Sequence, residues 1–128
     1  MEPRVAEIVN KWILKAEHDL KAADQMLRAD EPITDAACFH CQQAVEKYLK
    51  AYLVSRGVAP EKTHKLERLI EECSKWDKAF ISLAKTVVLS EYAVESRYPD
   101  DFFIPSLDEA NRALALAREV KQFLVNRF

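Results

Sequence analysis

Only one of the 128 residues in this chain is glycine, and this scarcity constrains the fold more than any other feature. Most of the chain consists of windows rich in Ala, Leu, Glu and Lys, which are strong helix formers. This composition predicts an all-helical protein. Aliphatic and aromatic residues make up 49% of the chain, enough for a real core, so we expect one domain over residues 1–128.

Apolar periodicity and helix-end signals predict two long helices in the N-terminal half. The first runs from about Pro3 to Arg28 and buries the stripe Ile8, Trp12, Ala16, Leu20, Ala23 and Leu27. The segment Asp30-Glu31-Pro32 breaks it. The second begins near Thr34 or Asp35, either of which is a good N-cap, and ends at Gly57, where a left-handed residue is wanted.

The C-terminal half predicts one short and two long helices. The short helix opens near Pro60 and Thr63 and buries Leu66, Leu69, Ile70 and Cys73. The next helix is capped by Asp77 and ends before Pro99. Its inward-facing residues are predicted to be Phe80, Leu83, Val87 and Val94. The last helix begins at the capping box Ser106-Leu107-Asp108-Glu109. Its inward face is predicted to consist of Leu107, Ala110, Leu114, Ala117 and Leu124. Short loops between these helices predict an antiparallel up-and-down bundle of four long helices and one short one.

The segment from Phe39 to Leu53 carries the strongest functional signal. At about 100° per residue, one side of this helix is an ordinary core face made of Cys41, Val45, Tyr48, Leu49 and Tyr52. The other side gathers Gln43, Glu46, Lys47 and Lys50, with Phe39 and His40 at its edges. Glu46 and Lys50 are four residues apart in the favourable order for an ion pair. The sequence leaves open whether this polar side is a solvated surface or a binding site.

Two other polar residues are placed toward the buried side of their helices. Gln42 projects toward the apolar arc, so its amide must find hydrogen bonds, either by capping an irregular loop or by bridging to a partner subunit. Asp19 interrupts the stripe of the first helix, and a buried carboxylate requires a cation. Lys50 and Arg97 are the candidates, in a structural ion pair or in a functional role.

The segment Arg97-Tyr98-Pro99-Asp100-Asp101 lies at the end of the predicted fourth helix. An Arg in the last turn complements the helix dipole, which alone explains its presence. A guanidinium beside a Tyr and two Asp at a loop mouth is also suited to binding an anion or stacking on a base.

Cysteines and charge limit the remaining options. Cys38 and Cys41 form a single CxxC on a helix face that also carries apolar residues, so we expect packed thiols rather than a metal site. His18 and His64 are interpreted as a surface residue and a helix-start residue.

The net charge of −2 excludes a general polyanion binder, so any nucleic-acid contact would be a local patch. The odd number of cysteines, the N-terminal Met1-Glu2-Pro3-Arg4 and the lack of a long apolar run predict a cytoplasmic protein without a membrane segment.

Several segments, taken in order, carry a family resemblance: Trp12 with Ala16, Asp19-Leu20 and Ala23; Phe39-His40 with Gln42-Gln43-Ala44, Glu46-Lys47 and Lys50-Ala51; Gly57 with Thr63-His64 and Leu66; and Arg97-Tyr98-Pro99-Asp100. This set resembles a prokaryotic HEPN domain over nearly the whole chain. The resemblance implies a helical bundle that usually forms a homodimer and is commonly paired with a minimal nucleotidyltransferase, often as a toxin–antitoxin couple. Many HEPN domains are metal-independent ribonucleases, and others bind nucleotide or RNA.

The ribonuclease branch of that family has an Arg and a His separated by four to six intervening residues. No Arg stands at that spacing before His18, His40 or His64, and no His follows Arg97 at positions 102–104. We therefore expect no catalytic residues and no cofactor or metal, although the question of enzyme activity stays open. Only Arg97 carries over, as a binding residue.

These observations predict a dimeric, cytoplasmic HEPN-type protein that binds a nucleotide or RNA in a polar cleft. The ligand-binding residues are expected to be Gln43, Glu46, Lys47, Lys50, Arg97 and Tyr98, supported by Asp19, Gln42 and Asp100. Lys50 and Arg97 would meet phosphate, and Tyr98 or Phe39 would stack on a base. One alternative is a ribonuclease with a degenerate site. The other is a pure interaction module whose polar face binds the nucleotidyltransferase.

Overall fold

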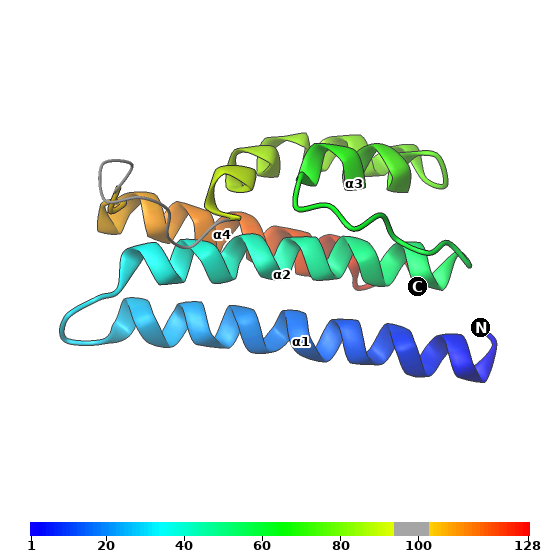
Figure 1. Cartoon of the computed structure of the whole chain (residues 1–128), viewed down its shortest axis with the longest axis horizontal. Helices are drawn as coiled ribbons and strands as arrows, with labels where there is room; N and C mark the ends of the chain where they lie inside the picture. Colours follow the sequence, from blue (N-terminus) through cyan, green and yellow to red (C-terminus); the bar gives the residue numbers. More distant parts are fainter. Residues whose placement is uncertain (94–102) are drawn as a thin grey trace.

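The computed structural model describes residues 1–93 and 103–128, and within these ranges helices are the only regular secondary structure (Figure 1). Its elements, in chain order, are α1 (Pro3–Arg28), α2 (Thr34–Ser55), α3 (Leu66–Ser74), the 3₁₀ helix η1 (Lys78–Tyr92) and α4 (Leu107–Leu124). The predicted class, four long helices and one short one, is confirmed. None of these helices is both long and apolar enough to cross a membrane.

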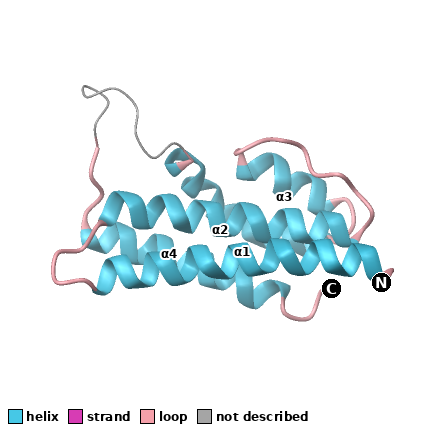
Figure 2. Cartoon of the chain, turned by 60° about the horizontal axis from the view of Figure 1, so that its bottom comes forward, coloured by secondary structure: helices cyan, strands magenta, loops and turns pink. Residues whose placement is uncertain are grey.

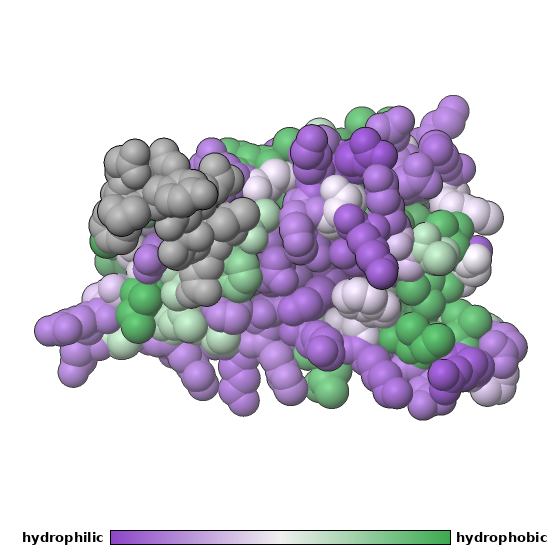
Figure 3. Space-filling model, viewed as in Figure 1, coloured by the Kyte–Doolittle hydropathy of each residue, from purple (hydrophilic) through white to green (hydrophobic). Residues whose placement is uncertain are grey.

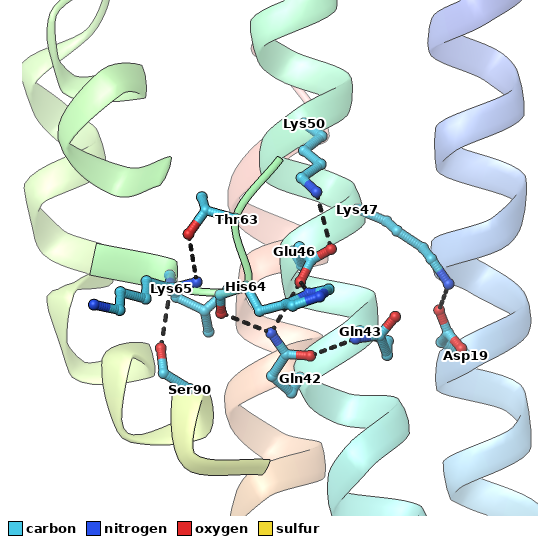
Figure 4. Close-up of polar contacts among 11 residues, drawn as sticks. Asp19, Gln42, Gln43, Glu46, Lys47, Lys50, Thr63, His64, Lys65 and Ser90 are labelled. Carbon is cyan, nitrogen blue, oxygen red and sulfur yellow. Dashed lines mark hydrogen bonds and ion pairs between the residues drawn. The ribbon is translucent and has the colours of Figure 1, made fainter. Parts of the chain in front are cut away.

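Helix α2 is the central element of the bundle. It contacts all four other helices, and most of its residues are buried. Figures 1 and 2 show α1 and α4 running along α2, with α3 and η1 on its other side. Among the described residues, α1 contacts α2 and α4 but neither α3 nor η1. One face of α2 lies between α1 and the loop that precedes α3, and none of the other described helices packs over it (Figure 4).

The helix ends largely agree with the local signals in the sequence. Helix α1 has the predicted bounds, and Gly57, just after α2, has a φ of 78°, which is the left-handed conformation expected there. Thr34 has a different role from the predicted one. Its hydroxyl donates a 2.7 Å hydrogen bond to the carbonyl of Pro105 and so ties the start of α2 to the start of α4.

Helix α4 differs from the prediction in its first turn. Ser106 accepts a 3.1 Å hydrogen bond from the backbone N–H of Glu109, as a capping residue should. The carboxylate of Glu109, however, accepts from the hydroxyl of Tyr92 instead of turning back to close the capping box. Leu107 was expected to be inward, but it is exposed, because the buried face of α4 begins only at Ala110. The other predicted inward residues of α4 are buried.

The 3₁₀ helix η1 has a strict three-residue repeat of buried side chains: Phe80, Leu83, Thr86 and Leu89. A 3₁₀ helix has three residues per turn, so this repeat places all four on one side. An α-helical pattern predicted Val87 and Val94 on the inner side. Val87 is only half-buried, because the tighter winding gives its place to Thr86 and Leu89, and Val94 lies outside the described residues. The buried hydroxyl of Thr86 is satisfied by the carbonyl of Leu83 at 2.7 Å.

The winding of η1 can be tested by two alanine substitutions in adjacent residues. In an α-helix, Leu89 would lie on the side opposite Phe80; in η1 it is 1% exposed, whereas Val88 is 54% exposed. We expect Leu89→Ala to lower the free energy of unfolding by about 2–5 kcal/mol. Val88→Ala should change it by about 0.5 kcal/mol or less. Chemical denaturation measures both, and equal or reversed effects would contradict the three-residue repeat.

Candidate functional site

A group of polar side chains covers the open face of α2 (Figure 4). We call it the polar face, and it consists of Asp19 from α1, of His40, Gln42, Gln43, Glu46, Lys47 and Lys50 from α2, and of His64 from the loop before α3. In the orientation of Figure 1, the space-filling view shows a hydrophilic band across the middle of this side of the molecule (Figure 3).

The carboxylate of Glu46 is the centre of the first cluster in the polar face. One oxygen binds Nζ of Lys50 at 3.0 Å, and the other is reached by Nδ1 of His64 at 2.8 Å and by Nε2 of Gln42 at 3.1 Å. The side chains of Glu46 and Lys50 are only 6% and 10% exposed. The predicted pair is therefore present, but it is buried, and the solvated-surface interpretation is wrong for it.

Gln42 connects this cluster to the loop before α3. Its side chain is fully buried, and its Nε2 also donates to the main-chain carbonyl of His64 at 3.1 Å. Its Oε1 accepts a 2.7 Å hydrogen bond from Gln43. Of the two roles predicted for this amide, the described contacts realise the first, which is capping an irregular loop.

The carboxylate of Asp19 is the centre of the second cluster. It is buried, as predicted, and its described partners are two residues that were not proposed for it: Oδ2 binds Nζ of Lys47 at 2.6 Å, and Oδ1 binds Nδ1 of His40 at 2.8 Å. The predicted candidate Arg97 lies outside the described residues. His40 and Lys47 are seven residues apart on α2, so they project from the same side and bracket the carboxylate from α1. Lys50 is instead held by Glu46.

Each buried carboxylate thus holds one lysine and one histidine. From the sequence, His40 was expected only at the edge of the polar side and His64 was interpreted as a helix-start residue, so both were missed as site residues. The seven-residue spacing of His40 and Lys47 could have identified His40 from the sequence. No sequence signal could have identified His64, because only the path of the loop brings it to Glu46, eighteen positions earlier in the chain.

The charges of this region favour an anion more than the whole-chain charge does. Asp19 and Glu46 balance Lys47 and Lys50, and burial, which alone would raise the pKa of Glu46, is outweighed by hydrogen bonds from His64, Lys50 and Gln42 that lower it. The exposed Lys15 precedes Asp19 by one helical turn and shares its side of α1, so it adds one positive charge beside the second cluster. Lys65 follows His64, but its side chain points away from Glu46 (Figure 4).

The predicted site also includes aromatic residues and the segment from Arg97 to Asp100. The half-buried ring of Phe39 meets the ring of His40 edge-on, with 5.4 Å between centroids. Nζ of Lys50 lies 5.8 Å from the centroid of the Trp12 ring, within reach of a cation–π interaction. Arg97, Tyr98 and Asp100 lie outside the described residues.

The cysteines pack inside the bundle, as predicted. Cys38, Cys41 and Cys73 are free and buried. Burial raises the pKa of Cys38 to about 11 and the pKa of Cys41 to about 12, so both thiols stay protonated at neutral pH. Within residues 1–93 and 103–128, no group of three or more His, Cys, Asp and Glu side chains could hold a metal ion.

A cavity of about 320 Å³ lies elsewhere, between η1 and α4. Its lining includes Val88, Tyr92, Phe103, Arg112 and Leu116. No residue of the polar face contributes to it. The polar face lies where α1, α2 and the loop before α3 meet, and it is distinct from this cavity.

Comparison with known proteins agrees with the resemblance in the sequence. The model of the HEPN domain family matches residues 9–128, and the chain therefore belongs to the HEPN family. The structure is similar to the crystal structure of TT1696 from Thermus thermophilus, with 27% sequence identity and a TM-score of 0.81 over 94% of this chain and 98% of that one. A comparison with curated proteins gives no match.

The buried state of Glu46 predicts how stability depends on pH. Its pKa is lowered in the folded protein, so its stabilisation is fully present above the ordinary carboxyl value of 4.5 and is lost as the pH falls through the lower folded-state pKa. Glu46→Gln should cost about 3–5 kcal/mol at pH 7, because it leaves Lys50 buried without its counterion. The deficit should shrink below pH 4.5.

Urea unfolding at several pH values measures this difference. The matched control is Glu72→Gln, since Glu72 forms an exposed ion pair with Lys75 and its loss should cost less than about 1 kcal/mol. A deficit for Glu46→Gln that is independent of pH would show that the carboxylate charge does not stabilise the fold.

Proposed function

We propose that this HEPN-family protein binds a phosphate-bearing ligand, a nucleotide or an RNA segment, on its polar face. The observation that carries the proposal is the state of two lysines. Each ammonium has three N–H donors, and the described contacts of Lys47 and Lys50 each use one of them. Both side chains are held against the protein, 21% and 10% exposed, by a carboxylate that fixes their position.

Two cations held in fixed positions, Lys47 partly exposed and Lys50 largely buried, favour an anion with several oxygens. Lys47 and Lys50 are three residues apart and lie on the same side of α2, so one phosphate group or two neighbouring ones can meet both. Little side-chain entropy remains to be lost on binding, because the carboxylates already order the lysines. Arg97 would add a third cation, and Tyr98 or Phe39 would stack on a base.

Family membership also supports a partner protein. We propose pairing with a minimal nucleotidyltransferase, in a cytoplasmic toxin–antitoxin-like module. The buried free thiols suit a reducing compartment. Co-purification of the native protein with its neighbours tests this part, and the recovered partner should carry a nucleotidyltransferase domain.

RNA cleavage is the second candidate function, and the two histidines favour it. A carboxylate that orients an imidazole leaves its other nitrogen available for proton transfer. One imidazole of the pair His40 and His64 would take the proton of a ribose 2′-hydroxyl as its oxygen attacks phosphorus. The other would protonate the leaving 5′-oxygen, giving a 2′,3′-cyclic phosphate. Formation of that product by the pure protein in the presence of a chelator would favour this function over binding alone.

The binding function predicts a specific effect of Lys47→Gln. The amide keeps a hydrogen-bond donor for Asp19 but removes the charge, so affinity for adenosine triphosphate or a short single-stranded RNA should fall by about 1.5–3 kcal/mol. Binding of the parent protein should also weaken as salt rises. Isothermal titration calorimetry measures both effects.

Lys85→Gln is the matched control, because Lys85 pairs with Glu119 at the surface, away from the polar face. Its affinity should equal that of the parent. Thermal melting establishes that each variant is folded. Equal affinity of folded Lys47→Gln and the parent for both ligands would rule out this site.

We also propose a homodimer. Large apolar side chains are exposed where η1 and α4 approach each other, including Phe103 (64%), Ile104 (54%) and Val88 (54%). Such a patch usually meets another chain. Light scattering at micromolar concentration should give a dimer for the parent, and Phe103→Asp should give a monomer; a monomeric parent would contradict the proposal.

A further inference from the structure

The two histidines of the polar face present the same atom to their carboxylates. Nδ1 of His40 lies 2.8 Å from Asp19, and Nδ1 of His64 lies 2.8 Å from Glu46. An ionised carboxylate has only acceptors, so Nδ1 must carry a proton in each case. Both carboxylates also bind a lysine ammonium through their other oxygen, and the hydrogen bonds to Glu46 lower the pKa of that carboxyl. The contacts therefore fix the tautomer of each neutral imidazole, leaving a lone pair on Nε2.

The Nε2 atoms are the free ends of these imidazoles. Within the described residues, neither has a hydrogen-bond partner. The His40 side chain is 28% exposed and the His64 side chain is 66% exposed, so ligand can reach both rings. An ionised phosphate oxygen, such as that of a phosphodiester, has no proton to offer and is repelled by a lone pair. It can be bound at Nε2 only after the imidazole gains a second proton.

We propose that His40 and His64 bind the anion through Nε2 and that each takes up a proton when the anion arrives. This inference rests on the proposed ligand class, and it names two ligand-binding residues and a regulation by pH. Imidazole is the side chain that changes charge between about pH 5 and 8. Binding should therefore tighten as the pH falls through that range, because the site gains up to two positive charges.

The neighbouring charges are compatible with this uptake. His40 faces Asp19 on α1 and Lys47 on α2, and His64 faces Glu46 and Lys50 on α2. In each cluster the carboxylate touches the imidazole itself, whereas the lysine binds the other carboxylate oxygen. On the segment around His64, the nearby acid Glu61 is already paired with Arg68.

Nuclear magnetic resonance tests each step with the intact chain. Long-range ¹H–¹⁵N spectra at high pH should show Nε2 unprotonated in His40 and His64. Sulfate is a suitable probe, because it stays fully ionised through this pH range. At a sulfate concentration about 100-fold above the dissociation constant of the protonated site, the titration midpoints of both histidines should rise by about two pH units. His18, exposed on α1, is the internal control, and its midpoint should stay in place.

Two results would overturn the inference: an Nε2-protonated neutral tautomer, or midpoints of His40 and His64 that move no more than that of His18. His64→Gln gives a second readout, since its uptake of protons on binding a 5′-hydroxyl uridine oligonucleotide should be smaller than that of His18→Gln. Calorimetry in two buffers of different ionisation enthalpy measures that uptake. Oligonucleotide binding without proton uptake would sink this inference and leave the proposed function standing. Sulfate-dependent midpoints without any nucleotide or RNA binding would contradict the proposed function and leave this inference standing.

Discussion

The arrangement of this bundle depends on one buried charge, the carboxylate of Glu46 on the central helix. A buried carboxylate without partners costs several kcal/mol, so the chain must bring donors to it. Lys50 comes from the next turn of the same helix, but His64 comes from the loop before α3. Satisfying Glu46 therefore requires this loop to lie along α2, and Gln42 holds it there through the carbonyl of His64. Helix α3 begins two residues after His64, at Leu66, whose N–H donates to the hydroxyl of Ser90 at 3.0 Å.

The sequence predicted the parts of the fold that local signals decide. The bounds of α1, the left-handed Gly57 and the capping role of Ser106 each depend on residues within one or two turns. The winding of η1 could not be predicted in this way. Its sequence places apolar residues at both three-residue and α-helical spacings, and packing against α2, α3 and α4 decides between them. Tertiary contacts overrode local propensity there.

The same distinction applies to the candidate site. The Glu46–Lys50 pair was predicted because both residues lie on one helix at a fixed spacing. The described partners of Asp19 were not, because whether Lys47 or the predicted Lys50 reaches it depends on how far α1 is shifted along α2. Periodicity gives the side of a helix on which a residue lies, but not its height relative to a neighbouring helix. His64 was missed for a related reason, since a loop path has no periodicity.

The structural and functional interpretations of the polar face are compatible, because one set of contacts serves both. The carboxylates that compensate for burial also place the lysines, set the tautomers of the histidines and leave N–H donors and Nε2 atoms free to meet a ligand. A purely structural network would be expected to satisfy its polar atoms internally. Here each carboxylate is satisfied by the protein, whereas Nε2 of each histidine has no partner among the described residues, at a face of α2 that none of the described helices covers. That asymmetry is the physical reason to look for an anion at this face.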